Sequence, residues 1–346
     1  MRKRFPRGYM TSIRDVAKSA GVSTSTVSHV INKTRFVSEE TQAKVRDAMK
    51  ALGYKPNRLA SSLRRKDKST NTLGLLIPDS ANLFFAEVLR GVEDACFEAG
   101  YSVFLCNSDD DPQKELDYIE VLLGKQIDGI ILVSVGIHKE SLTLLADNDI
   151  PSVLVDREVS GSINDSVVVD NEAGGHQATE RLIELGHTRI GCIAGPSLLT
   201  PSAARVQGYR KALSKYNLVQ DDALIIKGDF RAQTGFEATK DLLKIDNPPT
   251  AIFACNDMMA VGGLHAVDEA GLSVPKDISI VGFDDIPLAS FTLPPLTTIY
   301  QPSQEMGSLA AKMVMERIKK PNLPTRKEVL PTSLITRKSC RALDEK

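Results

Sequence analysis

The chain has 346 residues, of which 42% are hydrophobic and 25% are charged, and this length and balance favour a folded protein with more than one domain. Its longest apolar runs, such as residues 129–137, are as long as a strand and fall far short of the roughly 20 residues that cross a bilayer. No apolar stretch follows the basic residues 1–15 as a secretory signal requires, and the five cysteines form no CxxC pair. We therefore expect a cytoplasmic protein without a metal site.

The net charge of −1 conceals a strong asymmetry along the chain. Residues 1–69 hold 17 Lys and Arg but only 5 Asp and Glu, a net charge of +12, so the remaining 277 residues carry −13. A short basic run usually lies on a solvated surface, but here the excess spans a segment long enough to fold. A basic unit of this size favours nucleic acid as the partner.

Three short amphipathic helices are predicted in the basic segment. Ser12 can cap the first helix, with Asp15 three residues later, and Gly21 ends it. A tight turn leads to the second helix, and a third helix follows Ser38 and ends at Gly53. The hydrophobic residues recur at helical spacing, as Ile13, Val16, Ala17 and Ala20, then Val27, Val30 and Ile31, then Val45, Ala48, Met49 and Leu52. This order predicts a helix-turn-helix unit.

The second helix carries the polar side chains that such a unit presents to the major groove of DNA. We expect Thr24, Ser25 and His29 to read bases, and Ser23, Ser28 and Asn32 to bind phosphates. The predicted DNA-binding residues of this segment are Ser23, Thr24, Ser25, Thr26, Ser28, His29 and Asn32. The alternative is that they are only the solvent-facing residues of a three-helix bundle.

A further short helix is predicted in the basic residues 57–70. Pro56 fixes its entry, Asn57 can cap it, and Leu59, Ala60 and Leu63 share one side. A helix of two turns is marginal in water, so we expect this one to form only when it is docked. A plain basic linker would explain the charges but not the leucines.

From residue 72 onward, apolar strands alternate with helical stretches such as residues 86–100 and 260–271. The predicted strands are residues 72–78, 101–107, 128–134, 150–156, 189–195, 250–256 and 277–283. Strands alternating with helices indicate an α/β fold with doubly wound parallel sheets, which bind ligands beyond the carboxyl ends of their strands.

Polar and aromatic residues collect where these strands end. Asp156-Arg157, Asn256-Asp257 and Asp284-Asp285 each end a strand, Phe84-Phe85 follow the first strand, and Phe230 comes just after IIKGD at 225–229. Carboxylates accept hydrogen bonds from hydroxyl groups, Arg and Asn donate them, and aromatic rings cover the C–H face of a polyol. Together they suit a small carbohydrate. For any single residue the alternative is a cap on the following helix.

We find little support for catalysis. Dinucleotide, P-loop, serine hydrolase and zincin motifs are absent from the sequence, and Asp284-Asp285 has no evident nucleophile or base as a partner. Asp109, Asp110 and Asp111 precede Pro112 and are typical of a turn and a helix cap. We therefore expect a protein that is not an enzyme and that uses no cofactor.

Nearly the whole chain resembles the lac repressor family of bacterial transcription regulators, and most of all its ribose-responsive members. The similar segments are residues 13–32, 35–45 and 52–65, then VPKDISIVGFDDIPLASF at 274–291 and PPLTTIYQP at 294–302. The resemblance implies a helix-turn-helix head at 11–56, a hinge helix and linker at 57–70, and an effector-binding core at 71–340. Within it, Leu63 is the hinge leucine that wedges into the minor groove, beside Arg64, which we count among the DNA-binding residues.

The same resemblance implies a core like that of periplasmic sugar-binding proteins, with two subdomains joined by three crossings. One would comprise residues 72–169 with 302–328, and the other 170–301 with 329–340. Such a repressor is a homodimer that binds a pseudo-palindromic operator, and its ligand closes the cleft and changes whether the hinge helices form. The resemblance implies that a sugar releases the DNA.

Residue similarities favour D-ribose as the effector. A purine repressor is expected to carry an aromatic residue after Asp156 and polar side chains near Leu199 and Pro201, but Arg157 follows Asp156 here. The positions similar to periplasmic ribose-binding protein are Asn82, Phe84, Phe85, Asp156, Arg157, Arg205, Phe230, Asn256, Asp284 and Gln301, with Ser134 and Asn171 as two further positions. A purine corepressor, a carbon-control partner protein and, remotely, a sugar-processing enzyme with a DNA anchor remain alternatives.

Overall fold

The computed structural model describes residues 11–32, 35–54, 69–133, 139–157, 164–196 and 200–343. The chain divides into two compact units, a head that ends at Thr70 and a core that begins at Asn71. Hence the predicted hinge helix at 57–70 lies outside the described residues except for Ser69 and Thr70. Leu63, Arg64 and Ser134 also lie outside them. None of the described helices is long and apolar enough to cross a membrane.

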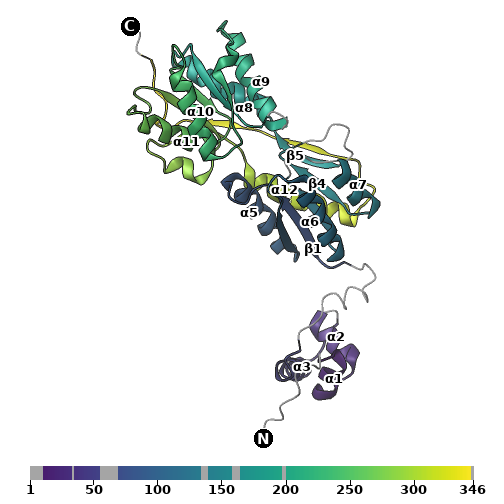
Figure 1. Cartoon of the computed structure of the whole chain (residues 1–346). Coiled ribbons are helices and arrows are strands. Elements are labelled where there is room, and N and C mark those ends of the chain that lie inside the picture. The colour runs from purple at the N-terminus through teal and green to yellow at the C-terminus, as the bar shows by residue number, and fades with distance from the viewer. Residues whose placement is uncertain are drawn as a thin grey trace. The chain divides into compact units, whose positions relative to one another are not determined.

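The head consists of the three predicted helices, α1 (Ile13–Ala20), α2 (Thr24–Asn32) and α3 (Glu39–Leu52) (Figure 1). Ser12 and Asp15 form the predicted capping box of α1, and Gly21 ends this helix with a φ of 68°. Because the helices are short, they depend on a shared core, which is made of Val16, Ala17, Val27, Val45 and Ala48.

The core contains two sheets of six strands each. The first sheet has the order β11-β5-β4-β3-β1-β2, and the five pairings along it are parallel. Its strands are β1 (Thr72–Ile77), β2 (Ser102–Asn107), β3 (Gly129–Leu132), β4 (Ser152–Val155), β5 (Asp165–Val169) and β11 (Lys327–Leu330). Helical crossovers connect β1 to β2, β2 to β3 and β3 to β4, and such crossovers give parallel strands, as predicted.

Helices cover both faces of the first sheet. Along β1, Leu73, Leu75 and Ile77 face one hydrophobic cluster and Leu76 faces another, because successive side chains of a strand point to opposite sides. The first cluster includes residues of α5 (Leu83–Glu98) and α12 (Ser303–Lys319). The second includes residues of α6 (Pro112–Gly124) and α7 (Lys139–Asp147).

The second sheet repeats this plan with the order β12-β10-β9-β8-β6-β7. Its strands are β6 (Ile190–Ala194), β7 (Ile225–Lys227), β8 (Ala251–Ala254), β9 (Ser279–Asp284), β10 (Thr297–Tyr300) and β12 (Ser333–Ile335), of which β12 is antiparallel to β10. Four helices pack on it, α8 (Asn171–Glu184), α9 (Thr200–Lys215), α10 (Ala232–Lys244) and α11 (Asp257–Glu269). Two short 3₁₀ turns, Asp222–Leu224 and Pro287–Ser290, complete this half.

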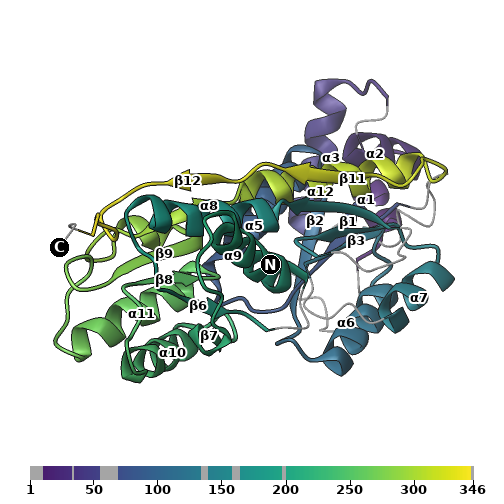
Figure 2. The ribbon, with the colours of Figure 1, turned by 90° about the horizontal axis from the view of Figure 1, so that it is seen from above.

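The last part of the chain links the two halves. In Figure 2 the segment with β11 and β12 runs from one sheet to the other, and β11 pairs with β5 while β12 pairs with β10. The strand memberships follow the subdomain limits inferred from sequence except at β11, which pairs with β5 as far as Leu330, past the expected limit at residue 328. The limits remain our proposal. The short strands β5, β7, β10, β11 and β12 were absent from the predicted set; β11, for example, is largely exposed and includes Lys327 and Glu328.

Pairs of glycines let neighbouring helices approach closely in each half. A Cβ atom at Gly91 of α5 would lie 1.9 Å from the carbonyl oxygen of Gln304, and one at Gly307 of α12 would lie 2.1 Å from that of Val88. In the other half, Gly175 of α8 lies against the backbone of Arg205 in the same way, with 2.2 Å to its carbonyl oxygen. The position of α9, and of Arg205 on it, thus requires a glycine at position 175, because any side chain there would collide with α9.

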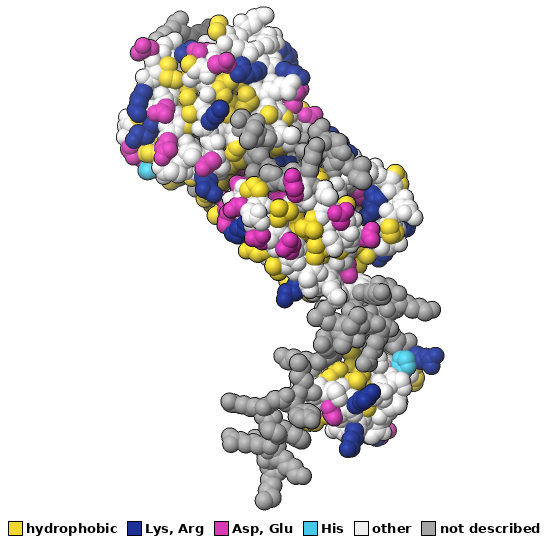
Figure 3. All heavy atoms as spheres, turned by 45° about the vertical axis from the view of Figure 1, so that its right-hand side comes forward, with side chains coloured by type: hydrophobic (Ala, Val, Ile, Leu, Met, Phe, Trp, Pro, Cys, Tyr) yellow, Lys and Arg dark blue, Asp and Glu magenta, His cyan; other side chains and the backbone are white. Residues whose placement is uncertain are grey.

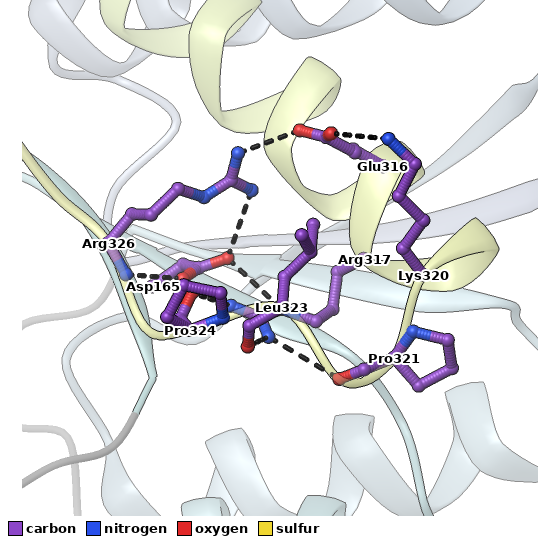
Figure 4. A network of polar contacts seen from close by, with 8 residues as sticks. All are labelled: Asp165, Glu316, Arg317, Lys320, Pro321, Leu323, Pro324 and Arg326. Carbon is purple, nitrogen blue, oxygen red and sulfur yellow. Dashed lines mark hydrogen bonds and ion pairs between the residues drawn. The ribbon is translucent and has the colours of Figure 1, made fainter.

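A network around Asp165 fastens α12 and β11 to the start of β5 (Figure 4). The Asp165 carboxylate is fully buried; its Oδ1 accepts hydrogen bonds from Arg317 Nη2 at 2.6 Å and from the Arg326 backbone N–H at 2.8 Å. Arg326 also pairs with Glu316 at 2.7 Å, and Arg317 donates to the carbonyl of Leu323. One buried carboxylate therefore joins three elements that are far apart in sequence.

Charged side chains of both signs cover the surface of the core. On the face shown in Figure 3, Asp and Glu side chains are interspersed with Lys and Arg, and hydrophobic side chains lie among them. The head shows Lys and Arg side chains at its surface in the same view.

Replacing Asp165 by Ala should lower the free energy of unfolding by about 3 kcal/mol, because Arg317 and Arg326 then lose a buried partner. Urea denaturation of the full chain measures this change. As a control, Lys114→Ala removes the exposed ion pair with Asp109 and a cation–π contact with Tyr118, and should cost less than about 1 kcal/mol. Equal losses in the two variants would contradict a structural role for the network.

Candidate DNA-binding helix and effector site

Helix α2 buries Val27 on its hydrophobic side, and none of the predicted DNA-binding residues whose burial is described is fully buried. Val27 is fully buried, while Ser23, Thr24 and Ser25 are exposed and Thr26, Ser28 and His29 are half-buried. Asn32 is the last residue of α2, and its side chain lies outside the described part of the chain. The face opposite Val27 is therefore available to a groove of DNA.

Ser23 has a structural role as well as its predicted one. Its Oγ accepts a hydrogen bond from the Thr26 backbone N–H at 3.0 Å, as an N-cap does, and lies 2.6 Å from the Ser25 Oγ. Since Ser, Thr and Val are poor helix formers, this cap and the buried valine stabilise the start of α2. A phosphate would have to share the Ser23 hydroxyl with the helix.

In the core, the predicted effector residues lie at the carboxyl ends of strands or in the first turns that follow. Phe84 and Phe85 begin α5 after β1, Asp156 and Arg157 follow β4, Asn256 follows β8, Asp284 ends β9 and Gln301 follows β10. The exceptions are Arg205, in the middle of α9, and Phe230, in the loop after β7. Arg205 lowers the pKa of Asp156 by attraction and Asp156 raises the pKa of Asp284 by repulsion, so the strand ends of the two sheets lie close enough to interact.

Arg205 organises the half of the site that the second sheet provides. Its Nε donates to Asn171 Oδ1 at 2.7 Å, and its Nη1 donates to the Cys255 carbonyl at 2.6 Å and, more weakly, to Asp284 Oδ1 at 3.4 Å. Its guanidinium also lies 3.8 Å from the centre of the Phe283 ring. The side chain is 3% exposed, so a buried cation connects α8, β8 and β9.

Three buried polar atoms in the site have no hydrogen-bond partner within the described part of the chain. They are Asp156 Oδ1, Arg157 Nη1 and Gln301 Oε1. The other side of Gln301 is used, because its Nε2 donates to Asp284 Oδ1 at 2.7 Å, and Arg157 Nε lies 3.8 Å from Asp156 Oδ2. Leaving a buried polar group unpaired costs roughly 1–3 kcal/mol, so these atoms are the natural contacts of a polar ligand.

Burial also shifts the ionisation of the site. It raises the pKa of Asp284 to about 7, although the nearby Arg205 and Gln301 oppose this shift. Burial likewise raises the pKa of Asp156, against the attraction of Arg205 and Arg157, and lowers the pKa of Arg157 to about 10. Perturbed groups that converge from different strands are typical of a functional site.

The backbone at the site is also unusual. Asp156, Phe230 and Asp284 have φ angles of 67°, 69° and 115°, a region that residues with a Cβ rarely occupy. Such conformations cost on the order of 1–3 kcal/mol each and persist where the surrounding structure holds them. The Phe230 ring lies against Gly195, where a Cβ would come within 2.2 Å of it.

Two predicted effector residues act as helix caps, as the alternative interpretation proposed. Asn82 caps α5 through a hydrogen bond from the Phe84 backbone N–H at 3.0 Å, and Asn256 caps α11 by accepting one from Met259. Asn256 Nδ2 also donates to the Phe230 carbonyl at 2.9 Å. For Asn256 we therefore infer that it organises the site in the unliganded protein.

Several contributors to the site were not singled out from sequence. The Cys255 carbonyl is a backbone group, and no side-chain pattern reveals it. Gly195 leaves space for the Phe230 ring. Its place directly after a strand, together with the prediction that Phe230 binds the effector, could have indicated this role. Asp111 caps α6 as expected, with bonds from Gln113 and Lys114, and no cluster suited to a metal ion occurs among the described residues.

The head and core therefore define a DNA-binding regulator with an effector-binding domain, and comparisons agree. Residues 12–57 match the model of bacterial regulatory proteins of the lacI family, and residues 179–340 match a periplasmic binding protein-like domain. The ribose operon repressor of Escherichia coli (strain K12) is 45% identical over 95% of this chain and its own full length. The transcriptional repressor PurR of Photobacterium profundum is 41% identical over 97% of this chain and its own full length.

Solved structures show the same architecture. The lac repressor dimer bound to operator and the anti-inducer ONPF matches with a TM-score of 0.86 and 30% identity, over 96% of this chain and 100% of that one. A regulator from Enterococcus faecium with bound ribose matches with a TM-score of 0.74 and 32% identity, over 79% of this chain and 100% of that one. The chain belongs to the lacI family of bacterial regulatory proteins and is a DNA-binding transcriptional repressor.

Asp284 should make the stability of the unliganded protein depend on pH. Between its unfolded pKa near 3.9 and its folded pKa of about 7, the folded protein holds a proton that the unfolded chain has lost. The free energy of unfolding should therefore fall as the pH rises through this window, by at most about 4 kcal/mol. Asp284→Asn should flatten the profile, as calorimetry across these pH values would show; parallel profiles for the two proteins would contradict it.

Proposed function

We propose that this repressor responds to D-ribose or a closely related pentose, which acts as an inducer that releases operator DNA. The observation that carries this proposal is the set of unpaired buried atoms at Asp156, Arg157 and Gln301, which offers two acceptors and one donor to a ligand rich in hydroxyl groups. Both a ribose repressor and a ribose-bound regulator are among the relatives, which supports the assignment.

The charges of the site favour an uncharged ligand. Two carboxyl groups, Asp156 and Asp284, lie among two guanidinium groups, Arg157 and Arg205, and all four residues are at most 7% exposed. A charged ligand would be desolvated beside a group of its own sign, which is costly. A neutral polyol exchanges hydrogen bonds with both signs without adding charge.

Aromatic residues supply the apolar surface that a sugar ring needs. Phe84 and Phe85 pack edge to face with centroids 5.2 Å apart at the start of α5, and Phe230 is half-buried beside Gly195 in the other half. Each half of the core thus contributes aromatic rings in addition to polar groups. The C–H faces of a pentose would pack on such rings while its hydroxyls meet the polar atoms.

A purine corepressor is the second candidate, because PurR proteins are also close relatives. Against it, position 157 holds a buried arginine where we expect an aromatic residue in a purine repressor, and Pro201 offers a buried apolar side chain. A purine would find a guanidinium at position 157 in place of an aromatic stacking partner for its ring system. We therefore rank the pentose first and keep the purine as the competing ligand in every binding test.

The mechanism we propose uses the division of the site between two halves. Asp156 and Arg157 belong to the first sheet, whereas Arg205, Asp284 and Gln301 come from elements around the second. A ligand held by both groups favours one relative arrangement of the halves, and it controls DNA only by binding the two arrangements with different affinity. We propose that the arrangement with sugar prevents residues 57–70 from forming the hinge helix, with Leu63 and Arg64 at the operator.

We propose that the working form is a homodimer. The edge strand β2 exposes Phe104 and Leu105, which are 46% and 45% accessible, and Phe97 at the end of α5 is 82% accessible. Exposed apolar residues on an edge strand mark a surface that pairs with another chain. The similar lac repressor structure is a dimer on its operator, which supports the same assembly here. Two heads would then read Thr24, Ser25 and His29 against two half-sites.

An enzyme fused to a DNA anchor is the remaining alternative. The close relatives of this chain are transcriptional repressors, and we propose that the chain has no catalytic activity and acts in the cytoplasm, where its operator is. Incubation of purified protein with D-ribose should leave the sugar unchanged.

Asp156→Ala and Arg157→Ala should each weaken D-ribose binding by about 100-fold, because each leaves buried charged partners unpaired. Calorimetric titration with D-ribose, other pentoses, hexoses, hypoxanthine and guanine measures the change, and operator affinity without ligand should stay nearly the same. Arg210→Ala removes an arginine of the exposed pair with Asp222 and serves as the control. Binding of hypoxanthine or guanine but not D-ribose by the natural protein would overturn the ligand assignment.

Leu105→Asp should convert the dimer into a monomer, because it places a charge in the proposed apolar interface. Sedimentation velocity gives the mass of the particle, and operator affinity should fall more than about tenfold because one head cannot span two half-sites. Val219→Asp adds the same charge at another exposed apolar position and should leave the mass unchanged. A dimer that persists in the Leu105 variant would show that this face is not the interface.

A further inference from the structure

Asp257 is a fully buried carboxylate beside the candidate site that is not among the predicted effector residues. It follows Asn256 in the first turn of α11. Its Oδ2 accepts a hydrogen bond from the Ile286 backbone N–H at 2.9 Å, and its Oδ1 accepts one from the Thr298 hydroxyl at 2.5 Å. The carboxylate thus connects the start of α11 to the chain after β9 and to β10.

The segment that Asp257 holds is the turn that presents Asp284. Asp284 and Asp285 have φ angles of 115° and 56°, so two consecutive residues with a Cβ occupy the left-handed side of φ space. Ile286 is the next residue, and its N–H is bound to Asp257. Without such an anchor the turn would relax toward a more common conformation, since each strained residue costs on the order of 1–3 kcal/mol.

Other contacts hold the first two residues of the same turn, Asp284 and Asp285. The Gln301 backbone N–H donates to the Asp284 carbonyl at 3.2 Å, and its Nε2 donates to Asp284 Oδ1 at 2.7 Å. Asp285 Oδ1 pairs with Arg337 Nη2 at 2.7 Å. Asp257 holds the third residue of the turn, Ile286. Gln301, Arg337 and Asp257 together therefore determine where the Asp284 side chain points.

The sequence leaves space for this buried carboxyl group. A Cβ atom at position 282, two residues before Asp284, would lie 2.1 Å from Asp257 Oδ1, so Gly282 is required where β9 passes the carboxylate. Placing a carboxylate away from water is costly unless it is hydrogen-bonded. An apolar pair would make a merely structural contact between α11 and β9 at a lower desolvation cost, which suggests that the position of the turn itself matters.

We propose that Asp257 is a positioning residue for the effector site, which holds the 284–286 turn so that Asp284 meets the ligand together with Arg205 and Gln301. It acts through Asp284 and does not touch the effector. The proposal rests on the proposed sugar-binding function of this site.

The test compares two buried threonines with the same substitution. Thr298→Val removes the hydroxyl that binds Asp257, and Thr239→Val removes a hydroxyl that donates to the Gly235 carbonyl within α10 of the same half. Both side chains are fully buried, and urea denaturation measures how much stability each variant loses, so that an effect on binding can be compared with it. Only Thr298→Val should weaken D-ribose binding, by on the order of fivefold in calorimetric titration.

Substitutions of Asp257 itself provide the second comparison. Asp257→Ala removes both anchors and should weaken D-ribose binding by more than about tenfold. Asp257→Asn keeps an acceptor for the Ile286 N–H and a donor for the Thr298 oxygen, so it should recover most of the affinity. Operator affinity without ligand should be unchanged in every variant that remains folded. Thr298→Val and Asp257→Ala binding D-ribose as the natural protein does would overturn the proposal.

Amide hydrogen exchange of the unliganded protein separates this proposal from the choice of ligand. The Ile286 amide should exchange faster in Asp257→Ala than in the natural protein, and Asp257→Asn should restore its protection. If the natural protein does not bind D-ribose, the ligand assignment fails, while faster exchange at Ile286 still supports the anchoring of the turn. Unchanged exchange at Ile286 in Asp257→Ala would overturn the positioning role whichever ligand binds.

Discussion

The buried guanidinium of Arg205 makes the interactions on which the candidate effector site depends. It binds the Asn171 side chain at the start of α8, the Cys255 carbonyl after β8 and the Asp284 carboxylate at the end of β9. These three strand ends would otherwise bring unpaired polar groups together in a desolvated region. A planar cation with five donors satisfies several of them at once, which a lysine could not do. The close contact of α9 with Gly175 sets the position of Arg205, so the geometry of the site depends on how α8 and α9 pack.

Much of this organisation was predictable from the residues, because it follows from periodic patterns. The head helices begin and end where Ser12, Gly21, Ser38 and Gly53 indicated, and apolar strands alternating with helices indicated parallel sheets with a site at their carboxyl ends. Of the strands that the sequence pattern did not find, β5 and β10 are largely buried and were missed, whereas β7, β11 and β12 contain no buried residue. Pairing with β5 and the Asp165 network determine the position of β11, and both are contacts between distant parts of the sequence.

Within the site, sequence predicted the chemical types better than their roles. Asp156, Arg157, Arg205, Asp284 and Gln301 are buried polar residues near the facing strand ends, but Asn82 and Asn256 also cap helices. A cap and a ligand contact use the same residue types at the same strand-to-helix junction, so a single sequence cannot separate them. Backbone strain at Asp156, Phe230 and Asp284 is equally invisible in composition, since it is imposed by neighbours such as Asp257 and Gly195.

The head makes the state of the core important for recognition of DNA. The exposed side chains of α2 are short hydroxyls, and Ser23 uses its own for the helix cap, so α2 offers little of the bidentate readout that Arg or Gln gives. Affinity from the basic residues of 1–69 is largely independent of DNA sequence. We therefore propose that much of the specificity arises from the spacing of two half-sites and from the deformation of DNA at Leu63, both of which require a dimer with ordered hinges. A ligand that changes the arrangement of the two halves of the core would then act on the dimer and hinges that this specificity for DNA requires.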